Sequence, residues 1–205
     1  MHPPRPLHRR RWLAWAAQLG LGAAALPTPA RPAAGDPDGF WARARQGGHL
    51  LLMRHARTEA GLGDPPGFRL DDCRSQRNLS DAGRDDARRL GQRLVQEGVR
   101  LDAVYSSAWC RCTETAALAF DPHHPPHRVW PALNSFFQGQ GDGVRQTREV
   151  LQRARQLQAP ANWMLVTHQV NITALTGAHP AMGEVFLTRP HPREAALEVL
   201  ARWRA

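Results

Sequence analysis

Three clusters of polar side chains in this sequence each follow a short apolar run, and their residue types suit the chemistry of an oxyanion. Arg54 and His55 follow the first run, Arg111 lies in the second cluster and His168 in the third. Guanidinium groups bind an oxyanion through paired N–H donors, and a neutral imidazole is a competent nucleophile. Such a set predicts a site for a multiply charged anion, for which phosphate is the natural candidate.

The apolar runs indicate the elements that position these clusters. Strands buried on both faces are predicted at 49–53, 103–105 and 163–166, with helical patterns between them. Strands that alternate with helices predict a three-layer α/β sandwich, with helices on both faces of a mainly parallel sheet. Ligands of such sheets bind at the carboxyl ends of the strands, so the three clusters are expected to meet in one crevice. The segments 184–188 and 197–203 are compatible with either strand or helix.

Four segments resemble, in order, the motifs of the histidine phosphatase superfamily, which includes the cofactor-dependent phosphoglycerate mutases. Arg54-His55-Ala56 is similar to its Arg-His-Gly or Arg-His-Ala signature, and Ser106 to Ala116 to its Ser-x-x-x-Arg-x-x-x-Thr-Ala motif. Asn78 to Arg84 resembles the segment that opens its first long helix, and Val166 to His168 the second-histidine motif. The resemblance spans about residues 49–190 and implies a phosphoglycerate mutase-like fold.

This resemblance implies that His55 forms a phosphohistidine, which water then hydrolyses. It implies that Arg54, Arg111 and His168 bind the phosphate, with Arg57 and Thr58 as further phosphate-binding residues, and that no metal or cofactor takes part. The physical chemistry agrees, because an imidazole attacks only when neutral and nearby guanidinium charge disfavours the imidazolium. The same arginines balance the charge on the equatorial oxygens during in-line transfer.

The sequence departs from the family where a general acid is usual. One branch carries a Glu near position 135 and the other an Asp after the second histidine, but here these positions hold Ser135 and Gln169. Losing general acid catalysis would slow alkyl phosphates most, because an alkoxide leaves poorly. A relocated acid is an open alternative, with these unranked candidates: Glu59, Asp64, Asp71, Asp72 and Asp142.

The cysteines and a histidine cluster complete the set of reactive side chains. Cys73 could pair with Cys110 or with Cys112, and the Cys-Arg-Cys spacing is too short for an ordinary zinc pair. The three histidines of 121–127 stand among prolines without a complementary ligand set, so we expect an exposed loop rather than a metal site.

The first 34 residues are predicted to be an export signal. Arg9, Arg10 and Arg11 precede the uncharged apolar stretch 12–26, and small residues follow at 30–34. That pattern is typical of a cleaved signal peptide, with a resemblance to the twin-arginine type. We therefore expect a histidine phosphatase domain at 35–205, a periplasmic or otherwise exported location, and no stable membrane anchor after cleavage.

The net charge of +9 does not indicate a nucleic-acid partner. Five arginines and no acid lie in the first 34 residues, so the remainder is only mildly basic, and every side chain with a fixed positive charge is an arginine. The expected activity is hydrolysis of a phosphoric ester or anhydride, and the expected partner is a phosphorylated small molecule or envelope glycan. A phosphohistidine or phosphoprotein phosphatase and a non-catalytic phosphate-binding module are the alternatives, and a mutase is the weakest of them.

Overall fold

A computed structural model describes residues 39–121 and 123–204, and the expected signal peptide at 1–34 lies outside this part of the chain. Six strands form one sheet in the order β3-β2-β4-β1-β5-β6. The strands are β1 (Leu50–Arg54), β2 (Ala103–Ser106), β3 (Arg128–Val129), β4 (Trp163–Thr167), β5 (Val185–Pro190) and β6 (Leu197–Trp203). The helices are α1 (Phe40–Gln46), α2 (Asp81–Gln96), α3 (Cys110–Ala119), α4 (Gly143–Ala154) and α5 (Gln169–Thr176), with short 3₁₀ turns at Cys73–Ser75, Pro131–Leu133 and Phe137–Gly139.

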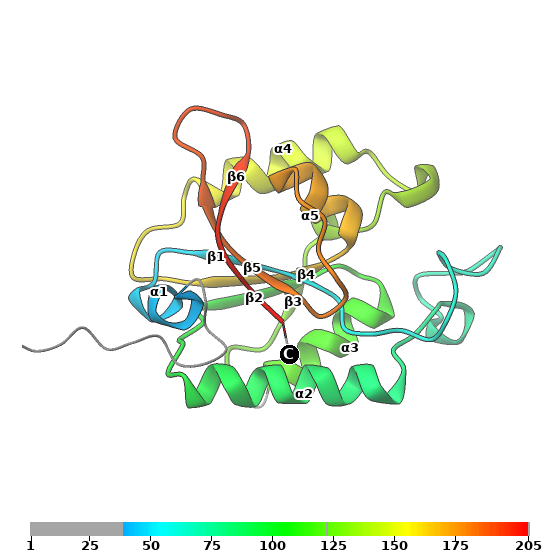
Figure 1. Ribbon diagram of the computed structural model, residues 1–205. Coiled ribbons are helices and arrows are strands. Elements are labelled where there is room, and N and C mark those ends of the chain that lie inside the picture. Colours follow the sequence, from blue (N-terminus) through cyan, green and yellow to red (C-terminus); the bar gives the residue numbers. More distant parts are fainter. Residues whose placement is uncertain (1–38, 122, 205) are drawn as a thin grey trace, which may run out of the picture. The chain divides into compact units, whose positions relative to one another are not determined.

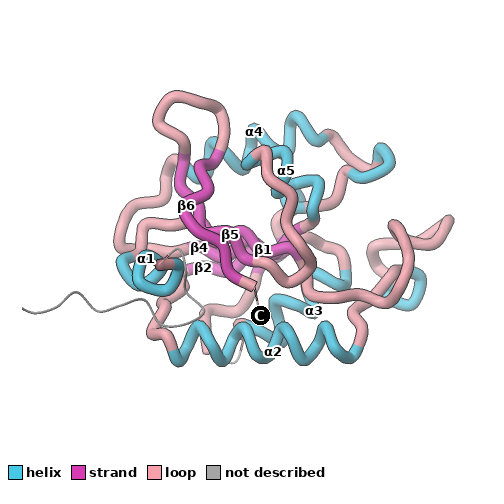
Figure 2. Tube along the Cα trace, viewed as in Figure 1, coloured by secondary structure: helices cyan, strands magenta, loops and turns pink. Residues whose placement is uncertain are grey.

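Helices cover both faces of the sheet, so the predicted three-layer α/β fold is confirmed (Figure 1). Figure 2 shows the strands between α2 and α3 on one side and α4 and α5 on the other. Alternate side chains of each strand feed two separate cores. Leu51 and Met53 of β1 pack with the layer of α1, α2 and α3, whereas Leu50 and Leu52 pack with the layer of α4 and α5.

The central strands bring the polar clusters to one edge of the sheet. β1, β2, β3 and β4 are parallel, with Arg54 opposite Thr167 and Ser106 opposite Val166. The carboxyl ends of β1, β2 and β4 therefore lie together, as the sequence predicts. The two late segments are strands, and both pair antiparallel: β5 with β1 and β6 with β5.

Helix α2 sets the position of the chain that follows β1. Ser80 caps the helix by accepting a hydrogen bond from the Gly83 N–H at 3.2 Å. A Cβ at Gly83 would lie 1.9 Å from the Arg57 carbonyl oxygen, and one at Gly91 would lie 2.0 Å from that of Ala119. Glycine at these two positions lets α2 pack closely on the segment after His55 and on α3.

The helices of the described chain are at most 16 residues long, the length of α2. None of those within 39–121 and 123–204 has both the length and the apolar character needed to cross a bilayer.

Candidate active site

The structure brings four of the predicted site residues into one pocket. Arg54 ends β1, His55 follows it, Arg111 lies in the first turn of α3, and His168 joins β4 to α5. All four line a cavity of about 110 Å³ at the carboxyl end of the parallel strands. The other lining residues are Leu62, Gly63, Asp64, Arg77, Ser135, Phe137, Gln140, Gln169 and Val170.

His55 is held with one ring nitrogen tied to the backbone. Its Nδ1 lies 2.9 Å from the carbonyl oxygen of Ala56, an acceptor only, so Nδ1 carries the proton and Nε2 carries the lone pair. The Ala56 N–H donates to Thr115 Oγ1 at 3.1 Å, and Thr115 Oγ1 donates to the Arg111 carbonyl at 2.6 Å. The threonine of the second motif thus fixes the backbone that orients His55.

Burial and neighbouring cations keep both histidines neutral. Burial lowers the pKa of His55 well below its usual range, and the positive charge of Arg111 lowers it further. The pKa of His168 is lowered well below its usual range by the same two causes in the same order. The two rings lie 5.6 Å apart between centroids. A neutral His55 has the free lone pair that nucleophilic attack requires.

The lowered pKa of His55 predicts a pH dependence of stability. An unfolded histidine binds a proton below about pH 6.5 while the folded His55 does not, so stability falls as pH decreases below that value. Between pH 7.5 and 5.5 this one group should cost the wild type about 1.4 kcal/mol of unfolding free energy, which a His55→Asn variant should not lose. Urea unfolding in phosphate-free buffer at the two pH values measures the difference. Equal losses for the two proteins would contradict a neutral, buried His55.

A hydrogen-bond chain behind His168 fixes its tautomer. Asn134 Oδ1 accepts from the Ala108 N–H at 2.8 Å and from Ser107 Oγ at 3.3 Å. Ser107 Oγ in turn lies 2.8 Å from His168 Nε2, which must therefore donate. His168 Nδ1 faces Arg111 Nη2 at 3.4 Å. Ser107 is an orienting group and not a nucleophile.

Arg111 is held by a buried ion pair. Its Nη1 donates to Asp64 Oδ1 at 2.7 Å, and the two side chains are only 5% and 3% exposed. Asp64 Oδ2 also accepts from Trp109 Nε1 at 3.0 Å, and Oδ1 accepts from the Arg77 backbone N–H at 3.0 Å. Of the five candidate acids, Asp64 is therefore the one placed in the pocket, but three donors already occupy its two oxygens.

The other candidate acids lie away from the pocket lining. Asp72 caps the 3₁₀ turn Cys73–Ser75 and Asp142 caps α4, each through a backbone N–H. Asp71 pairs with Arg69 at the surface, and Glu59 is exposed. Ser135 and Gln169, at the positions where the family usually has an acid, do line the pocket.

The structure places two of the predicted phosphate-binding residues, Arg57 and Thr58, outside the pocket lining. Arg57 is exposed and forms an ion pair with Asp86 of α2, and Thr58 donates to Met182 Sδ at 3.7 Å. Neither residue lines the cavity. The reason is the close approach of α2 at Gly83, which draws the chain after Ala56 along the helix and away from the strand ends.

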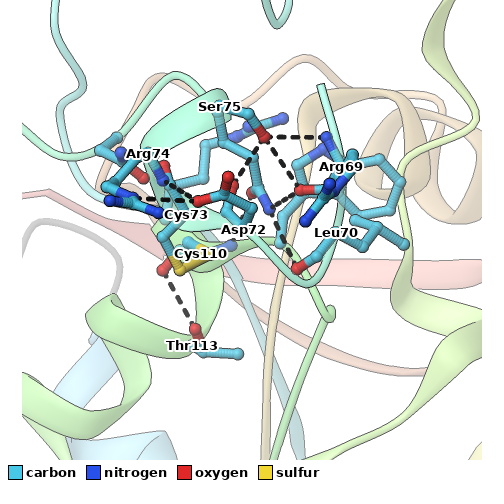
Figure 3. The surroundings of a disulfide bond; sticks show 12 residues. Arg69, Leu70, Asp72, Cys73, Arg74, Ser75, Cys110 and Thr113 are labelled. Atoms are coloured by element: carbon cyan, nitrogen blue, oxygen red, sulfur yellow. Dashed lines mark hydrogen bonds and ion pairs between the residues drawn. A yellow bond between two sulfur atoms is a disulfide. The ribbon is translucent and has the colours of Figure 1, made fainter. Parts of the chain in front are cut away.

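A disulfide joins the long loop 56–79 to the helix that carries Arg111. Of the two pairings left open, Cys73 bonds Cys110, and Cys112 remains a buried free thiol. Burial raises the pKa of the Cys112 thiol to about 12. Figure 3 shows the disulfide beside the turn that contains Asp72 and Ser75. Next to it, the Cys110 N–H donates to Gln76 Oε1 at 2.9 Å, so this end of the loop is fixed on α3.

Arg77 is a pocket residue that sequence reasoning did not identify. It lines the cavity beside Arg54 and Arg111, and its Nη1 donates to the Gly61 carbonyl at 2.6 Å. Its only sequence signal is its place directly before the Asn78–Arg84 motif. Burial lowers the pKa of Arg77, and the charge of Arg111 lowers it further.

The arrangement of the His, Cys, Asp and Glu side chains in the described chain bears on metal binding. Within 39–121 and 123–204, no group of three or more His, Cys, Asp or Glu side chains converges in a way that could hold a metal ion. In the 121–127 segment, His127 Nδ1 pairs with Asp121 at 3.0 Å.

The sequence profile that matches the chain decides its family. The histidine phosphatase superfamily, branch 1, matches residues 50–147, which contain Arg54, His55 and Arg111. The segment 50–147 is therefore that of the histidine phosphatase superfamily. Membership supports a phosphatase, and hence a hydrolase. Among curated proteins, none matches the sequence.

Solved structures show the same fold. The protein histidine phosphatase SixA, complexed with tungstate, is 16% identical with a TM-score of 0.55, covering 76% of this chain and 96% of its own. YhfR from Bacillus stearothermophilus is 19% identical with a TM-score of 0.57, covering 77% and 97%. The alpha-ribazole phosphatase from Shigella flexneri is 18% identical with a TM-score of 0.51, covering 74% and 94%.

Proposed function

We propose that this histidine phosphatase hydrolyses a phosphoric ester or anhydride through a phosphohistidine on His55. The observation that carries the proposal is the state of His55: buried, neutral, with Nδ1–H tied to the Ala56 carbonyl and Nε2 free. In the first step the Nε2–P bond forms and the bond to the leaving oxygen breaks. In the second, a water oxygen attacks phosphorus, the P–N bond breaks, and the proton of water passes to solvent.

The arginines of the pocket supply the positive charge that this transfer needs. Arg54 and Arg111 stand beside His55, and each has a buried Nε without a hydrogen-bond partner among the described residues. Donors of this kind suit the oxygens of a transferring phosphoryl group. No step of this route requires a metal or cofactor.

The availability of a proton donor in the pocket determines which leaving groups a substrate can have. Asp64 is the only acid among the lining residues, and its oxygens are occupied by Arg111, Trp109 and the Arg77 backbone. We therefore propose that the enzyme prefers substrates whose leaving group needs no proton from a carboxylic acid. This favours, as a second candidate function, a phosphohistidine or phosphoprotein phosphatase, because a neutral imidazole leaves more readily than an alkoxide.

A leaving-group series tests both proposals. The full-length protein in EDTA should hydrolyse p-nitrophenyl phosphate, and kcat/KM should fall steeply as the pKa of the leaving alcohol rises from aryl to alkyl phosphates. A free general acid flattens this dependence, because it contributes about 10²–10⁴-fold for poor leaving groups. Equal rates on aryl and alkyl phosphates would show that a proton donor operates. Absence of turnover on all of them, with orthophosphate still bound, would favour the non-catalytic binding module.

The remaining walls of the pocket bear on the natural substrate. Ser135, Phe137, Gln140, Gln169 and Val170 are uncharged, and together they present amide, hydroxyl and aromatic groups to whatever the phosphate is attached to. Such a lining suits a neutral, hydroxyl-rich group. With the predicted signal at 1–34, we propose an exported or periplasmic enzyme that acts on a phosphorylated small molecule or envelope glycan whose leaving group departs without a carboxylic acid, as in a phosphoric anhydride.

A further inference from the structure

We propose that Arg77 is a third phosphate-binding arginine of this site, in contact with the transferring phosphoryl group alongside Arg54 and Arg111. This inference deepens the proposed function and rests on it for the identity of the phosphoryl group. It assigns a role to the loop 56–79, which lies outside the strand ends that carry the other ligands.

The charge of the pocket first suggests a role for Arg77. Three guanidinium groups face one carboxylate, Asp64, and the two histidines are neutral. The excess is two positive charges, which matches a phosphate monoester dianion. Without Arg77 the excess would be one, and the dianion would be only half compensated.

The hydrogen bonds of Arg77 also favour a phosphate-binding role. No ion pair of the described residues includes the Arg77 side chain, and Asp64 accepts from its backbone instead. Its Nε is buried without a partner, as are Nε of Arg54 and Nε of Arg111. A half-buried cation beside the charge of Arg111 is costly on its own. An oxyanion between these guanidinium groups would offset their repulsion and accept from their free N–H groups.

Hydrogen bonds hold both the side chain and the backbone of Arg77 in place. Its Nη1 donates to the Gly61 carbonyl at 2.6 Å, and its backbone N–H donates at 3.0 Å to Asp64, the carboxylate that also holds Arg111. The neighbouring Gln76 accepts from the Cys110 N–H, and Cys110 is disulfide-bonded to Cys73. Arg77 and Arg111 are therefore fixed to one another through a shared carboxylate and a covalent bond.

Arg77→Gln and Arg77→Lys in the full-length protein test the inference, with Arg74→Gln as the matched control. Arg74 lies in the same loop, but its side chain is 95% exposed and pairs with Asp72. The probes are orthophosphate binding by calorimetry, inhibition by orthovanadate, and kcat/KM for p-nitrophenyl phosphate. Arg77→Gln should weaken all three by about 10- to 100-fold, as expected for a lost charge-assisted hydrogen bond. Arg77→Lys should recover part of the loss, and Arg74→Gln should match the wild type.

The urea midpoint in phosphate-free buffer separates binding from structure. It should be unchanged in Arg77→Gln, because the substitution also relieves repulsion from Arg111. Orthophosphate and orthovanadate affinities within twofold of the control would overturn the inference, and so would failure of Arg77→Gln to fold. If the wild type binds orthophosphate without turnover, the proposed function fails while the binding comparison still decides the role of Arg77. If the wild type does not bind orthophosphate, both proposals are wrong.

Discussion

Replacing His55 by alanine is expected to lower kcat for p-nitrophenyl phosphate by about 10⁴-fold or more, because the variant has no nucleophile to form the covalent intermediate. Orthophosphate should still bind within a few-fold of the wild type. Its proposed donors are guanidinium groups whose positions do not depend on His55. Arg54 donates to the Pro180 carbonyl, and Arg111 forms an ion pair with Asp64. Steady-state kinetics and calorimetry with orthophosphate measure the two effects separately.

His123→Ala is the matched control, since His123 is exposed and lies outside the pocket lining. It should leave kcat, KM and orthophosphate affinity unchanged. Rapid acid- and base-quenched samples of the wild type with ³²P-labelled substrate should contain an acid-labile, base-stable label that His55→Ala lacks. Substantial turnover by His55→Ala would mean that water attacks the substrate directly and that the phosphohistidine route is wrong.

The part of the site that lies on the sheet was predictable from sequence. Buried strands appear as continuous apolar runs, and parallel strands end at a common edge, so the residues that follow them meet there. Arg54, His55 and His168 belong to this class. Their placement depends on the apolar run of the strand directly before them, which is about five residues long and can be read from the sequence.

The loop residues were not predictable in the same way. Arg77 reaches the pocket because Gln76 and Cys73 are held on α3, more than thirty residues away in the sequence. Arg57 leaves the pocket because Gly83 lets α2 approach its carbonyl. Such placements depend on long-range contacts that carry no local pattern. A propensity or periodicity argument cannot therefore rank Arg57 against Arg77.

The geometry of helix α3 explains why Cys110, and not Cys112, bonds Cys73. Successive residues of a helix are rotated by about 100°, so Cys110 and Cys112 point to nearly opposite sides of α3. Cys112 faces the core and the His168 ring, with Sγ 3.5 Å from Nε2, and Cys110 faces the loop. Once the face of α3 that packs on the core is known, the pairing of Cys73 with Cys112 is excluded.

The second large effect is expected from Asp64→Asn, which should lower both stability and activity. The substitution leaves the buried Arg111 guanidinium without its counter-ion, and breaking a buried ion pair in this way costs about 3–5 kcal/mol of unfolding free energy. It should also lower kcat/KM by about 10²-fold, because a misplaced phosphate ligand weakens transition-state binding. Urea unfolding and steady-state kinetics in phosphate-free buffer measure the two losses.

Comparing the activity that Asp64→Asn loses on aryl and on alkyl phosphates distinguishes two roles of Asp64, orientation of Arg111 and donation of a proton. If Asp64 only positions Arg111, aryl and alkyl phosphates should lose the same factor. A loss much larger for alkyl phosphates would identify Asp64 as the missing general acid and would overturn the leaving-group preference proposed above. Asp71→Asn is the control from the same loop, since the Asp71 side chain is 81% exposed and its ion pair with Arg69 lies at the surface. Both Asp64 oxygens already accept a hydrogen bond, Oδ1 from Arg111 and Oδ2 from Trp109, so the structure favours orientation over proton donation.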